Sequence, residues 1–155
     1  MTMLKYISAF LVVLALCSFA IAQEIPSATS DQKVRLQAIS SDAAAIPKGS
    51  PVIIDFADTA SNSALTVEMV SGTSSVLIVG IAEDTIAVGA TGNIIVAGIT
   101  DVLFDAAGST AGATFGTGNT TKGSATSGQT GGGIVLATRS GAGLAKCLVK
   151  GIGMK

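Results

Sequence analysis

The stretch GATGNIIVAGITDVLF, residues 89–104, contains the pattern that decides the fold. Glycines at positions 89 and 92 frame a tight turn, and the apolar, largely β-branched residues that follow are typical of β-strands. Residues 93–99 and 100–104 are predicted to be two strands, or one long strand bent at Gly98. The stretch therefore predicts β-structure with glycine at its turns and bends.

The same pattern extends on both sides of this stretch, from residue 46 to residue 150. Short apolar runs separated by glycine predict an all-β fold, a small β-barrel or sandwich of short strands with glycine-rich turns. Residues 76–81 are apolar on both faces and are expected to form a central core strand, and residues 140–143 are expected to close a final hairpin. The predicted strands are 52–56, 65–70, 76–81, 93–99, 100–104, 134–137 and 144–149.

The sequence divides into three segments. Residues 1–22 resemble a secretory signal, with Lys5 before an apolar run and Ala20-Ile21-Ala22 as a cleavage pattern. Residues 23–45 are polar and are predicted to be an extended N-terminal arm, a linker or an edge strand. Residues 46–155 are predicted to be the β domain, in which the Gly/Ser/Thr-rich segment 108–133 is a long loop or a loose hairpin.

The composition argues against catalysis. The chain has no histidine, and only 12% of its residues are charged, against about 25% in an average protein. Cys147 is the one cysteine outside the signal-like segment, and without a histidine partner it is predicted to be a small buried apolar residue. We therefore expect no catalytic residue, and the protein is not expected to be an enzyme.

The sequence also predicts no cofactor, metal or nucleic-acid site. A net charge of −1 does not favour binding to a phosphate backbone. Residues 118–123 look superficially like a phosphate-binding loop, but Lys122 is not followed by serine or threonine. The carboxylates between residues 55 and 105 lack the dense Asp/Asn/Gly pattern of a calcium loop. These carboxylates are Asp55, Asp58, Glu68, Glu83, Asp84, Asp101 and Asp105.

Two stretches, IPKGSPVI at 46–53 and VGIAEDTIAVGATGNIIVAGI at 79–99, resemble the small capsid cement, or head decoration, proteins of tailed phages. The hairpin at 133–149 fits the same pattern, so the resemblance covers about residues 46–150. It implies a small β-barrel domain, often a trimer, on the outside of a viral shell, where it bridges major capsid subunits. The expected partners are the major capsid protein and further copies of the chain, and the expected location is the capsid surface of the virion.

An alternative follows from residues 1–22. If this segment directs export, the protein would be a secreted bacterial surface or filament-forming structural protein, assembled by strand addition between subunits. Contact with a membrane is expected only if the segment is retained. The intact mass of the native protein distinguishes the capsid hypothesis from the secreted one, because a mature chain that begins at Gln23 indicates secretion.

Overall fold

The computed structural model describes residues 32–58, 64–71, 78–117 and 121–150. The chain divides into a unit of residues 1–30 and a unit of residues 31–155, and the described residues belong to the second unit. Residues 56–58 are helical. The strands of the described part are β1 (Val34–Ser40), β2 (Pro51–Ile54), β3 (Thr66–Met69), β4 (Gly80–Ala82), β5 (Thr91–Phe104), β6 (Thr114–Thr117), β7 (Ala125–Ser127), β8 (Gly131–Val135) and β9 (Gly143–Val149).

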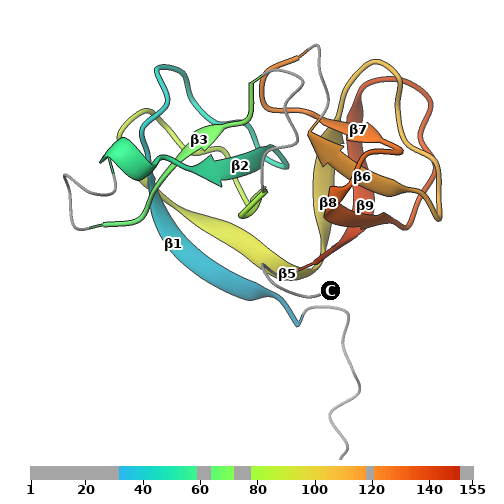
Figure 1. Ribbon diagram of the computed structural model, residues 1–155, viewed down its shortest axis with the longest axis horizontal. Helices are drawn as coiled ribbons and strands as arrows, with labels where there is room; N and C mark the ends of the chain where they lie inside the picture. The colour runs from blue at the N-terminus through green and yellow to red at the C-terminus, as the bar shows by residue number, and fades with distance from the viewer. Residues whose placement is uncertain (1–31, 59–63, 72–77, 118–120, 151–155) are drawn as a thin grey trace, which may run out of the picture. The chain divides into compact units, whose positions relative to one another are not determined.

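These strands close into two small five-stranded barrels that share β5. Figure 1 shows β5 running from the strands of the first barrel to those of the second. The first barrel has the strand order β1, β3, β2, β4 and residues 91–97 of β5. It closes because these residues of β5 also pair with β1. In the second barrel, residues 98–104 of β5 pair with β7 and β9, and β6 and β8 complete the ring. The predicted all-β barrel is therefore confirmed.

The two barrels meet at Gly98, in the middle of β5. Its φ of 115° is a conformation that residues with a Cβ rarely adopt, and an added Cβ would lie 2.5 Å from the carbonyl oxygen of Gln32. Glycine at this position therefore allows β5 to leave one barrel and enter the other. The prediction of one long strand bent at Gly98 is confirmed.

Each barrel encloses its own apolar core. Side chains that point inward from alternate positions fill the first barrel, among them Val52, Val67 and Ile94. The second barrel is filled around Phe104 and Phe115, whose rings meet edge to face with centroids 5.9 Å apart. Burial of these β-branched and aromatic side chains is the main contribution to the stability of each barrel.

The second barrel repeats the pairing scheme of the first. In each barrel the first and third strands pair in parallel and the other pairings are antiparallel. The register repeats as well, because Ile81 pairs with Ile95 in the first barrel, and Ile134 pairs with Leu148, 53 positions later, in the second. Strand β5 is thus the last strand of the first repeat and the first strand of the second.

The turns of the two barrels repeat in the same way. Gly49 and Gly112, 63 positions apart, have φ values of 81° and 83°. The N–H group of Gly49 donates to the carbonyl of Ala82, and that of Gly112 donates to the carbonyl of Val135, each at 2.9 Å. An isolated antiparallel bridge accompanies these turns in each repeat, Ile46 with Ile86 and Ser109 with Arg139. The described residues therefore form a structural duplication.

The structure corrects three sequence predictions. Strand β1 pairs with both β3 and β5, so residues 34–40 belong to the β domain and are neither an arm nor an edge strand, and the domain does not begin at residue 46. The segment 108–133 is not one loop, because it contains β6, β7 and the start of β8, and β6 and β7 form the alternative hairpin. The predicted strand 76–81 is instead the shorter β4, and residues 76 and 77 lie outside the described residues.

Candidate interaction surface

The outward side of β8 and β9 carries apolar side chains that nothing in the described chain covers. Burial alternates along β9, so that Leu144, Lys146 and Leu148 point outward while the residues between them face the core. Large apolar side chains with 38% to 46% of their surface exposed lie on these two strands or directly after them. We call this surface the β8–β9 outer face, and it consists of Ile134, Leu136, Leu144, Lys146 and Leu148.

Cross-strand pairing makes the β8–β9 outer face continuous. Ile134 lies opposite Leu148, and the backbone N–H of Leu136 donates to the carbonyl of Lys146 at 2.8 Å. On the other side of β9, Leu144 lies opposite Leu103 of β5. Contiguous exposed apolar side chains of this kind are typical of a surface that binds another macromolecule.

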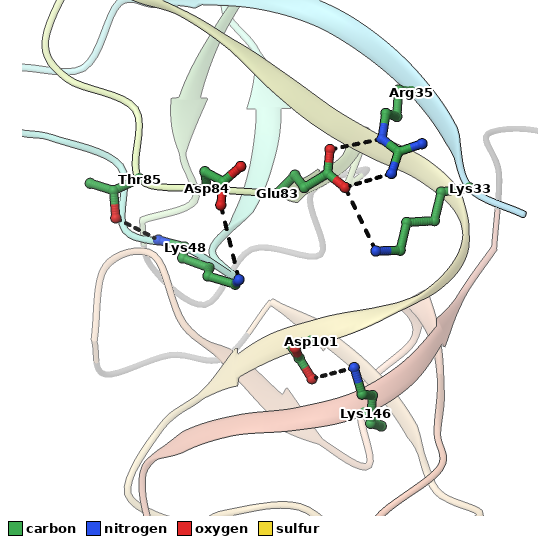
Figure 2. Close-up of polar contacts among 8 residues, drawn as sticks. All are labelled: Lys33, Arg35, Lys48, Glu83, Asp84, Thr85, Asp101 and Lys146. Atoms are coloured by element: carbon green, nitrogen blue, oxygen red, sulfur yellow. Dashed lines mark hydrogen bonds and ion pairs between the residues drawn. The ribbon is translucent and has the colours of Figure 1, made fainter. Parts of the chain in front are cut away.

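Figure 2 shows an ion pair between β5 and β9 and further ion pairs that involve β1 and the loops of the first barrel. The ammonium of Lys146 lies 3.1 Å from the carboxylate of Asp101, its cross-strand partner. Lys48 lies 3.9 Å from Asp84, and this pair is largely exposed. Exposed pairs of this kind contribute little to stability, so we assign them to solubility and to the choice of binding partner.

Glu83 has the best-formed ion pair among those drawn in Figure 2. The guanidinium of Arg35 donates two hydrogen bonds of 2.8 Å to its two carboxylate oxygens, and Lys33 lies 3.6 Å away. The Arg35 hydrogen bonds hold the pKa of Glu83 below its usual value. This pair joins the start of β1 to the residue after β4.

Replacing Glu83 with glutamine is expected to reduce the free energy of unfolding by about 0.5–1 kcal/mol, because Arg35 is partly exposed and water screens the pair. Urea unfolding at low and high ionic strength measures this, and the difference between Glu83→Gln and wild type should shrink as salt is added. A loss above about 2 kcal/mol would contradict the assignment of a screened surface pair.

Asp42 is a buried carboxylate that ties the two barrels together. Its side chain is 1% exposed and accepts hydrogen bonds from the backbone N–H of Met69 at 3.0 Å and from the ammonium of Lys122 at 2.8 Å. Lys122 belongs to the connection between β6 and β7, whereas Met69 ends β3. Burial raises the pKa of Asp42, but the hydrogen bonds from Lys122, Met69 and Ala44 outweigh it and leave the pKa below its usual value.

Asp42→Asn is expected to lower the free energy of unfolding by about 2 kcal/mol at pH 7, because the hydrogen bonds to a charged acceptor are lost. Since the folded-state pKa is depressed, this stabilisation is complete above the unfolded-state value of about 4 and disappears as pH falls through the lower folded-state value. Urea midpoints at pH 7 and pH 3 should therefore show the gap between wild type and Asp42→Asn closing on the acid side. A gap of the same size at both pH values would contradict this, and Asp84→Asn, at an exposed position, is the matched control.

The counterpart of Asp42 in the second repeat is Asp105. Each aspartate accepts a hydrogen bond from the backbone N–H two residues later, Ala44 in one repeat and Ala107 in the other. Asp105 also accepts a hydrogen bond from the hydroxyl of Thr126 on β7. The repeat thus reuses an aspartate to fix the turn after its first strand.

The other carboxylates that were considered as metal ligands do not come together. Asp55 accepts hydrogen bonds from the backbone of Ala57 and Asp58, which orders the turn after β2, and Glu68 lies on β3. Among the described residues, no group of three or more His, Cys, Asp or Glu side chains is placed to hold a metal ion. In the same part of the chain, no helix is long and apolar enough to span a membrane.

Cys147 is fully buried in the core of the second barrel, as the sequence predicted. Burial raises the pKa of its thiol to about 12, so the group stays protonated at neutral pH. A protonated, inaccessible thiol is neither a nucleophile nor a metal ligand. Cys147 therefore acts as a core residue.

No protein-family model and no curated protein matches this sequence. Among solved structures, the fold is shared with a phage head protein. That structure is the head fiber gp8.5 N base of bacteriophage phi29, which matches with a TM-score of 0.55 over 76% of this chain and 93% of that chain, at 12% sequence identity. At this identity the likeness shows the fold alone, and it agrees with a resemblance to phage head proteins without singling out the cement or decoration family.

Sequence reasoning missed both the β8–β9 outer face and the duplication behind it. The sequence signal for the duplication is short: Asp42-Ala43-Ala44 recurs at residues 105–107, and each copy is followed at the same distance by the glycine of the turn, Gly49 or Gly112. In β9, Leu144, Lys146 and Leu148 alternate with the smaller Ala145 and Cys147, which indicates two faces but not which of them points outward.

Proposed function

We propose that this protein is a structural component of a phage head, which binds the outside of the capsid and bridges major capsid subunits. The observation that carries the proposal is the fold shared with the phi29 head fiber base over most of both chains. The sequence resemblance over residues 46–150 supports the same class. The role proposed is mechanical, in which contact area and not chemistry does the work.

The surface chemistry of the described residues supports this role. Apolar side chains gather on the β8–β9 outer face, and neutral ion pairs lie beside them. A surface with little net charge binds through shape and apolar contact, which suits a close-packed shell. The proposed partners are the major capsid protein and further copies of this chain, assembled as a homo-oligomer such as a trimer.

Mass spectrometry of purified virions tests the proposal. The chain should be present in a fixed number of copies per shell, and cryo-electron microscopy should place its barrels on the outer capsid surface. Absence from virions, or recovery of the chain from the culture medium only, would overturn the proposal and favour the secreted alternative. Recovery inside the shell would contradict the proposed surface location.

A further inference from the structure

The duplication shows what a surface equivalent to the β8–β9 outer face does within the chain. Ile81 and Ile95 of the first repeat correspond to Ile134 and Leu148 of the second, and each pair lies directly opposite across its two strands. Yet Ile81 and Ile95 are fully buried, whereas Ile134 and Leu148 are each 41% exposed. This cross-strand pair of side chains is therefore covered in the first repeat, whereas no described residue covers its counterpart in the second.

The second barrel itself supplies the cover in the first repeat. The neighbour Ala82 points into the core of the first barrel, so Ile81 points out of that barrel. Ile81 lies in one hydrophobic cluster with the second barrel's core residues Val102 and Val149. The outward side of β4 thus closes one end of the second barrel, the end at which β5 enters it.

The matching end of the first barrel has no such cover within the described chain. At this end of the second barrel, Thr100 and Val149 are 5% and 3% exposed. The corresponding strand positions of the first barrel are Leu36 on β1, which is 42% exposed, and Val96 on β5, which is only partly buried. Val34, two residues before Leu36 and on the same face of β1, is 55% exposed. We call Val34, Leu36 and Val96 the open end of the first barrel.

The described part of each copy therefore carries two apolar surfaces that no other described residue covers, and the contact between its own barrels shows how surfaces of these two types fit together. We infer that the β8–β9 outer face binds the open end of the first barrel of a second copy, in the arrangement that joins the two barrels inside one chain. Such a contact is head to tail, because different surfaces of the two copies meet. Repeated contacts close into a ring where the rotation between copies allows it, and otherwise extend into a filament.

Residue differences between the repeats support this pairing. Where the first repeat has Glu83 and Thr91 on its outward side, the second has Leu136 and Leu144. The outward side of the second repeat is thus richer in apolar side chains than the side that is already covered. Charged residues are depleted and large apolar residues are enriched at the centres of protein interfaces, so the changes favour a buried contact.

Complementary variants of the full chain test the inference in analytical ultracentrifugation. Leu148→Lys damages the β8–β9 outer face and Leu36→Lys damages the open end, so each variant alone should weaken self-association at least tenfold. Mixed together, they should form a dimer and nothing larger, because only one intact face and one intact end remain to meet. Val88→Lys, at an exposed valine in a turn of the first barrel, is the matched control and should associate like wild type.

Several results would overturn the inference. A wild type that stays monomeric over the whole concentration range would overturn it, and a Leu36→Lys variant that associates like wild type would exclude the open end. A mixture that fails to form the dimer, although circular dichroism shows both variants folded, would exclude the head-to-tail pairing. Symmetric face-to-face pairing would also overturn the inference: Leu148→Lys alone would abolish association, but Leu36→Lys alone would still form a dimer through its intact β8–β9 outer face.

Thiol cross-linking gives a readout that does not depend on disruptive charges. Leu36→Cys and Leu148→Cys are prepared separately, each with Cys17→Ser, while Cys147 stays buried and unreactive. A short bis-maleimide should join the two variants when they are mixed and should give little product with either one alone. A cross-linked dimer from Leu148→Cys alone, or no product from the mixture, would contradict the inference.

The inference deepens the self-association part of the proposed function and does not depend on the capsid. Both experiments use the purified chain, whereas the proposed function is tested on virions. Association without virion incorporation would sustain the inference and overturn the proposed function. Virion incorporation of a chain that stays monomeric in isolation would do the reverse.

Discussion

Replacing Phe115 with alanine is expected to reduce the free energy of unfolding by about 3–5 kcal/mol, a large share of the 5–15 kcal/mol that is typical of a domain. Phe115 is fully buried and packs edge to face against Phe104. Its ring also lies directly against the backbone of Gly132, where an added Cβ would come within 2.2 Å of the ring. The truncated side chain would therefore leave a cavity that the surrounding strands cannot easily fill.

Urea unfolding measures this loss, and two further variants calibrate it. Phe115→Leu keeps most of the apolar volume and should lose less than half as much. Val52→Ala, at the position in the first barrel that corresponds to Phe115, removes two methyl groups from a fully buried site and should cost about 2 kcal/mol. A loss below about 1 kcal/mol for Phe115→Ala would contradict the packing of the second core.

Much of the fold was predictable because the pattern of short apolar runs and glycines reflects local chemistry. The long strand bent at Gly98 follows from an apolar run with a glycine in its middle, and the structure confirms it. The final hairpin could also be predicted, since its two strands lie close together in the sequence. Such features depend on residues near one another in the chain.

The duplication could not be predicted in the same way, because no single repeat period connects the two barrels. Counterparts are 63 positions apart in β2 and β6, 58 apart in β3 and β7, and 53 apart in β4 and β8. The connections from β2 to β3 and from β3 to β4 are both longer than their counterparts in the second repeat. The polar segment before residue 46 was misassigned for a different reason. Strand β1 is paired on both sides, yet the exposed open end near Val34 and Leu36 gives it no clear alternation of burial.

The interaction surface was also hidden from sequence reasoning, although its residues are ordinary. Leu148 looks like a core residue because it lies in an apolar strand, and only the pairing of β9 with β8 and β5 shows that it points outward. Its meaning then comes from comparison with Ile95, the buried counterpart in the first repeat. A surface defined by such a correspondence requires the three-dimensional register, which no local pattern contains.

Replacing Gly133 with alanine is expected to cost about 3–5 kcal/mol, because two effects act at one position. Its φ of 147° lies in a region that residues with a side chain rarely adopt, and an added Cβ would lie only 2.0 Å from the carbonyl oxygen of Leu148. That oxygen belongs to the strand that pairs with β8, so the two strands would have to move apart. The apolar pair of Ile134 and Leu148 would then lose its alignment.

Two other glycines separate these effects in thermal and urea unfolding. Gly112→Ala meets no atom within 4 Å but has a φ of 83°, so it should show the backbone cost alone, about 1 kcal/mol. Gly80 is the counterpart of Gly133, and its added Cβ would lie 2.7 Å from the carbonyl oxygen of Ile95, the counterpart of Leu148. Gly80→Ala should therefore fall between the other two variants, since it has a steric clash without a positive φ. Equal losses for Gly133→Ala and Gly112→Ala would show that the close approach of the β8 and β9 backbones does not contribute to stability.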